Sequence, residues 1–164
     1  MTYIIPFKER PVMIGQGFNT GSHKNWQEDK EDFTYSIDFL LPEGTKIIAS
    51  REGVVTKVKS KGNKNYSGKN LERGEESYKK WMNEIEIKHN DDTYASYCHL
   101  QKNGCFVKVG DKVNKKQKIG LSGNTGWSSQ PHLDFTVFKK NVGDYKIKSI
   151  KIKFEDYNKS LEIK

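Results

Sequence analysis

The sequence predicts an all-β protein with many turns and long surface loops. Its 164 residues include 14 glycines but only 4 prolines, and short apolar runs alternate with charged ones. No stretch is long and apolar enough for a membrane span. A chain of this length fits one domain and buries roughly two thirds of its unfolded surface, so we expect 1–164 to form a single domain.

The first half of the chain supplies four strand candidates and one polar loop. "TYIIPF" (2–7) is a strand that Pro6 ends. The glycine-rich, polar segment 15–32 is expected to be a surface loop. "FTYSIDFLL" (33–41) is a strong strand, and 46–60 contains two short strands joined at "REG".

Residues 61–82 are polar and charged, and we expect a long excursion from the sheet there. One helical turn is expected over "GEESYKKWM" (74–82). Loops of this length inside domains are usually functional or disordered.

The sheet pattern resumes after this excursion. Residues 83–89 and 93–100 form a hairpin around "NDD", and 107–123 contain two short strands around a "GD" turn. "HLDFTVF" (132–138) is the last clear core strand. The tail, 145–164, alternates isoleucine with lysine and is expected to add an edge strand, whose lysines discourage further pairing.

The strand 132–138 alternates strictly between two faces. Leu133, Phe135 and Val137 form an apolar face that locates a core. His132 and Asp134 project from the opposite face, side by side, and therefore form a candidate metal or catalytic pair.

The remaining histidines and one carboxylate lie in different settings. His23 lies in the glycine-rich loop, and His99 ends the strand 93–100. His89 alternates with isoleucines before a turn, so a structural role is expected for it. Asp38 interrupts an apolar run, where its charge must be neutralised by a cation, a basic side chain or several donors. Coordination of a metal cation is one way to neutralise the charge of Asp38.

These motifs together resemble the lysostaphin/LytM-type zinc endopeptidases, metallopeptidase family twenty-three. The resemblance rests on "GSHK", "YSIDF", "PEGTKIIASREGVV", "NEIEIKHNDDTYASYCHL" and "VKVGDKVNKKQKIGLSGNTGWSSQPHLDF", in the order of the family. It covers about 4–138, and 139–164 is then a basic C-terminal extension. The resemblance implies an antiparallel β fold with a groove around one zinc ion, and hydrolysis of peptide bonds in bacterial peptidoglycan.

The resemblance also implies the site residues. His23 and Asp38 match two zinc ligands of the family, while His99 and His132 match its catalytic histidines. Asp134 stands where the family has its third zinc ligand, a histidine. This is the one departure from the pattern.

The departure leaves two hypotheses open. Zinc accepts aspartate oxygens at about the same distance as imidazole nitrogens, so Asp134 can replace the histidine. A second carboxylate makes the site less positive than the ligand set of the family, so the ion should lower the pKa of its bound water to a smaller extent. Such a site could also accept another divalent ion, such as manganese. Alternatively the metal is lost and Asp134 is a partner of His132 or His99. Retention of His23 and the other site residues favours a retained metal.

We therefore expect a metal-dependent endopeptidase that acts on peptidoglycan peptides. Trp127 and Tyr66 lie in loops that would wall the groove and could contact substrate. The alternative is a catalytically silent module that binds peptidoglycan or regulates another hydrolase.

The formal net charge of +8 favours either solubility or attraction to a polyanion such as the acidic polymers of a cell wall. Nucleic acid is the weakest candidate, because the basic residues are scattered and arginines number three. The N-terminus lacks the charged start and apolar run of a secretory leader, so we expect either a cytoplasmic chain or one whose leader has been removed. The resemblance nevertheless implies the cell envelope or secretion, and we expect a monomer.

The two cysteines, Cys98 and Cys105, have neither metal-type nor redox-type spacing. A disulfide is conceivable, but two buried or half-buried thiols are the expected state.

Overall fold

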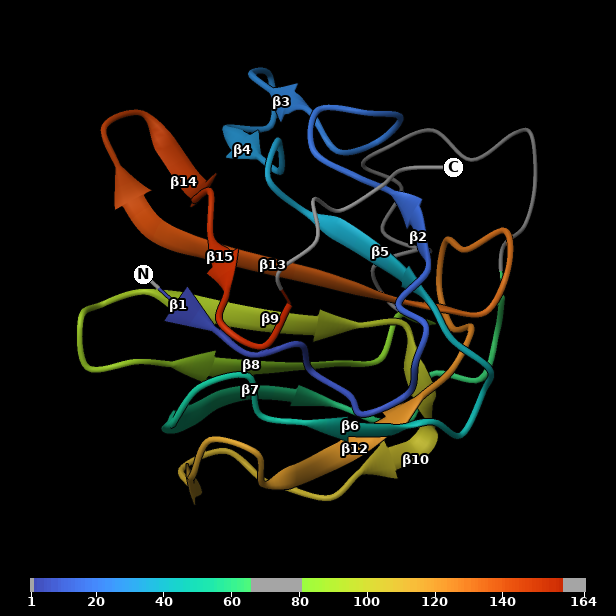
Figure 1. Ribbon diagram of the computed structural model, residues 1–164. Coiled ribbons are helices and arrows are strands. Elements are labelled where there is room, and N and C mark those ends of the chain that lie inside the picture. Colours follow the sequence, from blue (N-terminus) through green and yellow to red (C-terminus); the bar gives the residue numbers. More distant parts are fainter. Residues whose placement is uncertain (1, 66–80, 158–164) are drawn as a thin grey trace.

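Fifteen strands make up the regular structure of the described residues, 2–65 and 81–157, in a computed structural model of the chain (Figure 1). The predicted all-β fold is confirmed. In chain order the strands are β1 (Thr2–Tyr3), β2 (Ile14–Gln16), β3 (Asn25–Trp26), β4 (Glu31–Asp32), β5 (Ile37–Leu40), β6 (Lys46–Ile48), β7 (Gly53–Lys59), β8 (Glu84–Lys88), β9 (Tyr94–Cys98), β10 (Leu100–Cys105), β11 (Lys112–Val113), β12 (Lys118–Ser122), β13 (His132–Val142), β14 (Tyr145–Ser149) and β15 (Lys153–Phe154).

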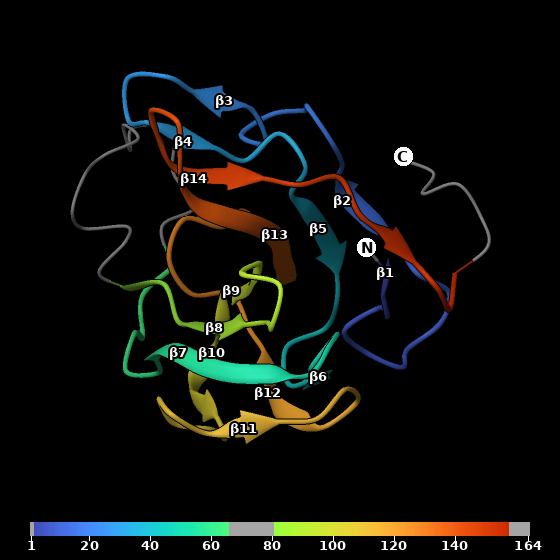
Figure 2. The ribbon, with the colours of Figure 1, turned by 90° about the vertical axis from the view of Figure 1, so that its left-hand side faces the viewer.

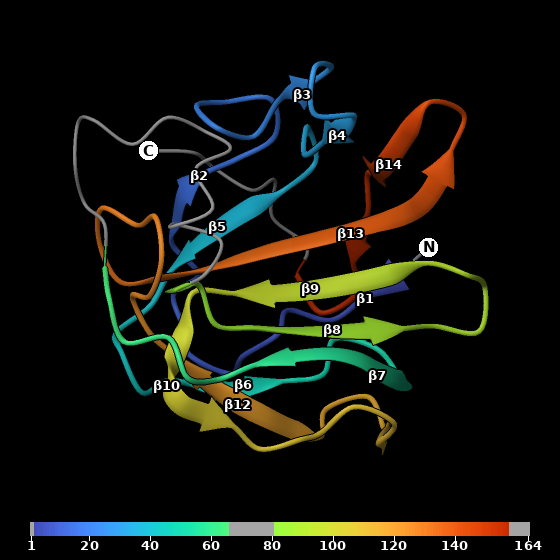
Figure 3. The same ribbon diagram turned by 180° about the vertical axis from the view of Figure 1, so that it is seen from behind.

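The main sheet has ten strands and is organised around β13. Its order is β11-β7-β8-β9-β13-β14-β4-β3, with β5 paired to both β13 and β2. At 11 residues β13 is long enough to pair with β5 and β9 near its start and with β14 near its end (Figure 3). Segments from both halves of the chain therefore meet at the start of β13.

A second, three-stranded sheet contains β10, β12 and β6. It lies below β7 and β8 in Figure 1, and in Figure 2 it shares the lower part of the view with β7 and β11 of the main sheet. A separate parallel pair joins β1 to β15, so the C-terminal part of the described chain returns to its N-terminal strand.

The core lies on one face of the main sheet. The apolar face predicted for β13 is buried as expected, and Phe135 is only 1% exposed. Its ring centroid lies 5.2 Å from that of Tyr97, 6.1 Å from that of Phe154 and 6.4 Å from that of Tyr3. Aromatic contacts of this kind stabilise beyond the area they bury.

The structure corrects two expectations for the sheet edges. The tail was expected to add an edge strand, and its β15 does so beside β1, but its β14 pairs with β13 on one side and with β4 on the other. β4 itself comes from 15–32, which was expected to be only a loop and instead contributes strands that cover this edge.

The helical turn predicted over 74–82 falls almost entirely outside the described residues. Within the described ranges, helices of the length and hydrophobicity needed to cross a bilayer are absent.

Replacing Phe135 with alanine should remove the centre of the aromatic core. We expect Phe135→Ala to lower the free energy of unfolding by about 3–5 kcal/mol, since the neighbouring rings can collapse only partly into the cavity. Urea denaturation followed by far-UV circular dichroism measures this. Lys139→Ala, at an exposed position of the same strand, should change it by less than about 0.5 kcal/mol.

Candidate metal centre

At the start of β13, two of the predicted site residues, His132 and Asp134, pair with residues of β5. In the antiparallel pairing of β13 with β5, Asp134 stands directly opposite Asp38, and His132 stands opposite Leu40. On its other side Asp134 is opposite Cys98 of β9. Because side chains alternate along a strand, His132 and Asp134 both project from the face opposite the core.

His23 reaches the same place from the loop between β2 and β3. The loop is held locally, since the backbone N–H of His23 donates to the carbonyl of Thr20 at 2.8 Å. The side chain is buried, and its Nδ1 lies 3.1 Å from the carbonyl oxygen of Gly17. A carbonyl only accepts, so Nδ1 carries the proton and Nε2 is directed inward.

Three potential ligand atoms converge. One atom each of His23, Asp38 and Asp134 lies within 4.8 Å of the others. Nε2 of His23 is 3.2 Å from Oδ1 of Asp38. His132 lies at the border of this donor cluster, with its Nε2 3.7 Å from the same oxygen.

His99 and His132 lie next to one another on the same side of the donor cluster. Their ring centroids are 4.4 Å apart. Nδ1 of His99 donates to the carbonyl of Thr125 at 2.7 Å, and Nδ1 of His132 donates to that of Gln130 at 2.8 Å. Ser128 Oγ lies 3.0 Å from the same nitrogen of His132.

The backbone also positions His99. Its φ of 63° lies in the left-handed region, which non-glycine residues rarely adopt. The non-glycine residues that do adopt it often lie at functional sites. This turn separates β9 from β10 and places the imidazole next to His132, at the start of β13.

The three imidazoles therefore share one tautomer. Each donates its Nδ1–H to a backbone carbonyl, which leaves Nε2 with a lone pair in the neutral ring. Partners of this kind fix the ring orientation of metal-binding and catalytic histidines.

Burial and neighbouring charges shift the pKa values of the site. Burial lowers the pKa of His23, but Asp38 and Asp134 raise it more, so it lies above its ordinary value. Burial and the neighbouring His132 lower the pKa of His99 to about 4. Burial and the charge of Asp38 raise the pKa of Asp134 to about 6.

The donor cluster fits a divalent metal ion. Oδ1 of Asp38 is buried and has no hydrogen-bond partner among the described residues, although Nε2 of His23 faces it. Two lone-pair-bearing atoms face each other favourably only with a cation or a proton between them. Imidazole nitrogen and carboxylate oxygen are both ordinary zinc ligands, and tetrahedral ligands about 2.0–2.1 Å from zinc lie roughly 3.3 Å apart.

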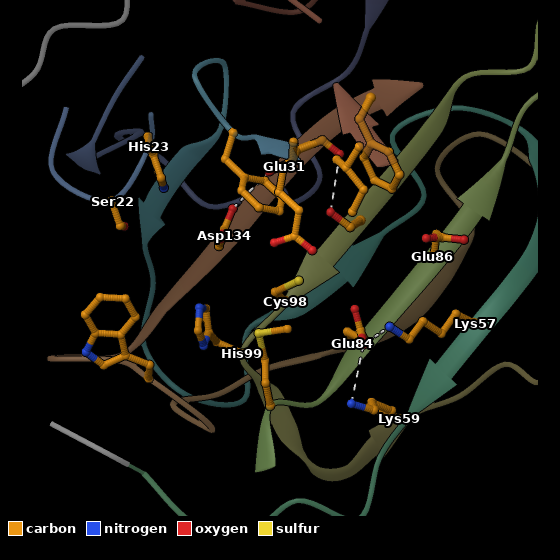
Figure 4. A pocket seen from close by; sticks show the side chains of 17 residues that line it. Ser22, His23, Glu31, Lys57, Lys59, Glu84, Glu86, Cys98, His99 and Asp134 are labelled. Atoms are coloured by element: carbon orange, nitrogen blue, oxygen red, sulfur yellow. Dashed lines mark hydrogen bonds and ion pairs between the residues drawn. The ribbon is translucent and has the colours of Figure 1, made fainter. Parts of the chain in front are cut away.

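The donor cluster lies where two hollows of the surface meet. The first, of about 240 Å³, extends over the main sheet toward Glu84 and Lys57 (Figure 4). The second contains Asp38, His132 and Trp26. Both are lined by His23, His99, Trp127 and Asp134, so an extended chain could pass over the cluster from one to the other. We call the two hollows together the groove.

The structure places the other residues discussed from the sequence in different parts of the molecule. Trp127 lines the groove as expected, whereas Tyr66 lies outside the described residues. His89 is buried on the core side, where its Nδ1 contacts the carbonyl of Glu52 and its ring lies against Tyr3, so its predicted structural role is confirmed. Cys98 and Cys105 are unpaired thiols, and Cys98 is buried in the groove.

Several groove residues were not predicted. Trp26 lies in β3, within the segment 15–32 in which only His23 had been singled out, and Ser128 lies in the loop in which only Trp127 had been singled out. Glu84 was overlooked, although strand alternation opposite Ile85 placed it on the same face as Asp134. The backbone acceptors of the three histidines have no sequence signature, because any residue supplies a carbonyl.

Residues 32–145 match Peptidase family M23, and the chain belongs to this family. The matched span contains Asp38, His99, His132 and Asp134. His23 precedes it.

Three relatives place the chain within this family. It is 36% identical over 120 residues to "Glycyl-glycine endopeptidase ALE-1" of Staphylococcus capitis, covering 73% of this chain and 25% of the relative. It is 37% identical over 98 residues to "Peptidoglycan DD-endopeptidase ShyA" of Vibrio cholerae, covering 60% and 18%. The structure of the antimicrobial peptidase lysostaphin from Staphylococcus simulans superposes with a TM-score of 0.55 at 27% identity, covering 84% and 47%. The chain thus spans about a quarter or less of the two curated relatives, and about half of the lysostaphin structure.

The neutral state of His99 can be measured directly. In metal-free protein we expect its imidazole to titrate near pH 4, because burial and His132 disfavour the charged ring, so that it is uncharged at pH 6–8. Histidine Cε1–H resonances followed by NMR between pH 3 and 8, with His99→Gln for assignment, provide the test. A midpoint between pH 6 and 7 would contradict this environment.

Proposed function

We propose that the chain is a metal-dependent endopeptidase that cleaves peptide bonds of bacterial peptidoglycan, with zinc held by His23, Asp38 and Asp134. The observation that carries the proposal is the convergence of one imidazole and two carboxylates in the middle of a groove that continues on both sides. An enzyme that cuts within a peptide needs room for the chain on both sides of the scissile bond.

The relatives support the same substrate class. Two are named as a glycyl-glycine endopeptidase and a peptidoglycan DD-endopeptidase, and the third is named as an antimicrobial peptidase. A peptidoglycan substrate implies that the protein acts in the cell envelope or outside the cell. The net charge of +8 is compatible with an acidic wall.

Within this site a bound zinc ion would supply Lewis acidity toward a water molecule and a peptide carbonyl. His132 is placed to take the proton of the attacking water at Nε2, since its Nδ1–H is fixed on the carbonyl of Gln130. As the C–N bond breaks, the same nitrogen returns that proton to the leaving amine. His99, neutral at working pH, accepts a hydrogen bond at Nε2 and orients the water.

The silent wall-binding module remains the alternative function. It would use the same groove without requiring a metal ion. The structure of the donor cluster favours the enzyme, because a buried carboxylate oxygen without a hydrogen-bond partner in the described chain is costly unless a cation binds it.

Metal removal distinguishes the two functions. We expect one zinc ion per chain by elemental analysis, release of soluble fragments from purified sacculi, and loss of this activity with a chelator. Asp38→Asn should abolish stoichiometric zinc and lower the rate at least about 100-fold, because Oδ1 of Asp38 has no hydrogen-bond partner within residues 2–65 and 81–157. Asp144→Asn, in the exposed β13–β14 turn, should behave as wild type. Wall binding without zinc or cleavage under any condition would establish the module instead.

Replacing Asp134 with histidine tests its role as a ligand. Asp134→His should retain zinc and move the pH–rate profile toward lower pH by roughly one unit, because an imidazole leaves the site more positive and favours deprotonation there. Zinc content and initial rates on sacculi from pH 5 to 9 measure this. If neither quantity changes, Asp134 lies outside the metal site.

A further inference from the structure

A pair of buried hydroxyl groups lies beside the two carboxylates of the donor cluster. The register that places Asp134 opposite Asp38 continues by two residues to Thr136 and Ser36, just before the start of β5. Because side chains alternate along a strand, the two hydroxyls project from the same face as the two carboxylates. Thr136 is 2% exposed and Ser36 is 0% exposed. The proposed chemistry uses neither of them.

The two hydroxyls and the carboxylate of Asp134 form a chain of hydrogen bonds. Oγ of Ser36 lies 2.5 Å from Oγ1 of Thr136. Oγ1 of Thr136 donates to Oδ1 of Asp134 at 3.3 Å. A hydroxyl carries one proton and an ionised carboxylate only accepts, so Ser36 donates to Thr136 and Thr136 donates to Asp134. The chain therefore runs in one direction and ends on the carboxylate.

The charge of the carboxylate sets this direction. Ser36 and Thr136 could satisfy one another without Asp134, with either hydroxyl as the donor. A hydrogen bond to an ionised group is roughly twice as strong as one between neutral groups, so the proton of Thr136 is directed to Asp134. Hydrogen bonds aligned in one direction polarise one another, and the bond from Ser36 makes Thr136 a better donor. The two buried hydroxyls thus act on a residue of the donor cluster.

Thr136 restrains the carboxylate of Asp134 at one oxygen. It makes the only hydrogen bond to the Asp134 side chain within residues 2–65 and 81–157, and this bond ends on Oδ1. Asp38 is held differently, because its Oδ1 has no hydrogen-bond partner in the same ranges and faces the imidazoles of His23 and His132. Two carboxylates that stand opposite each other repel, so an unrestrained Asp134 would turn away from Asp38. The bond from Thr136 opposes this rotation.

We propose that Thr136, supported by Ser36, positions Asp134 for metal binding by holding Oδ1 and leaving Oδ2 as the ligand atom. This inference rests on the proposed metal site. A carboxylate that uses one oxygen counts as a single ligand, and with His23 and Asp38 it leaves the fourth position of a tetrahedral zinc site open. Hydrogen-bond partners of metal ligands fix the orientation of those ligands, and their loss typically costs about 10–100-fold in metal affinity or activity.

The test measures zinc affinity, which does not depend on cleavage. Thr136→Val removes the hydroxyl and keeps the shape of the side chain. We expect its apparent dissociation constant for zinc at pH 7, measured by competition with a chromogenic chelator, to rise about 10–100-fold. Thr136→Ser retains a hydroxyl and should recover most of the affinity. Ser36→Ala should weaken zinc binding less than Thr136→Val does, because Thr136 can still donate to Asp134. Thermal melting verifies that the variants are folded.

Two comparisons separate positioning from a general effect on the sheet. Ser96 stands opposite Thr136 on β9, where its hydroxyl donates to the carbonyl of Thr136 at 3.5 Å and contacts the thiol of Cys98. Because these partners lie outside the donor cluster, Ser96→Ala should bind zinc as wild type does. In Asp134→His protein, a metal-bound imidazole has no lone pair left to accept the Thr136 hydroxyl, so adding Thr136→Val should change zinc affinity much less than in wild type.

Equal zinc affinity of wild type and Thr136→Val would overturn the inference. An equal loss in wild type and in Asp134→His protein would also overturn it, because the effect would then not act through the carboxylate. Failure of Thr136→Ser to recover affinity would likewise contradict it. Failure of the proposed function is distinct: if the affinities follow the expected pattern but sacculi are not cleaved, the positioning role stands and the peptidase activity does not. If wild-type protein binds no zinc, both are wrong.

Discussion

Asp38 and Asp134 stand directly opposite each other on neighbouring antiparallel strands, and this like-charge pair is the constraint on which the site depends. Carboxylates in such a position repel one another, and partial burial increases the cost. The charge of Asp38 accordingly raises the pKa of Asp134. A divalent cation relieves both the repulsion between the carboxylates and the cost of burying their charge. His23 brings an imidazole nitrogen to the same point. The register between β5 and β13 therefore creates the conditions for binding a metal.

The same strand supplies both the site and the core that holds it. Leu133 and Phe135 are buried against the aromatic core, while His132 and Asp134 project into the groove. Sites built on strands are held more accurately than sites built on loops alone. Of the three proposed metal ligands, only His23 comes from a loop, and backbone contacts to Gly17 and Thr20 fix it there.

Local pattern singled out Asp38 and the pair His132 and Asp134, whereas the roles of His23 and His99 were implied by the family resemblance. Asp38 was recognisable because it interrupts an apolar run, and Asp134 because strict alternation separates it from Phe135. The metal roles assigned to them remain predictions that rest on resemblance and geometry. Pairing between distant segments was beyond local pattern: the placement of β14 beside β4 depends on residues more than 100 positions apart in the sequence. The burial of Glu84 and Glu86 likewise follows from β7 lysines and Lys140, which no local period reveals.

A donor set with two carboxylates balances the charge of a divalent ion, whereas a set with one leaves a positive charge. X-ray absorption at the zinc K-edge distinguishes the two, because multiple scattering from imidazole rings counts the histidine ligands. For protein loaded with one equivalent of zinc, coordination by His23, Asp38 and Asp134 predicts one imidazole per zinc, with oxygen ligands at about 2.0–2.2 Å. Asp134→His serves as the two-imidazole reference. Two or more imidazoles per zinc in the unaltered protein would show that His99 or His132 binds the metal in place of Asp134, and would contradict this account.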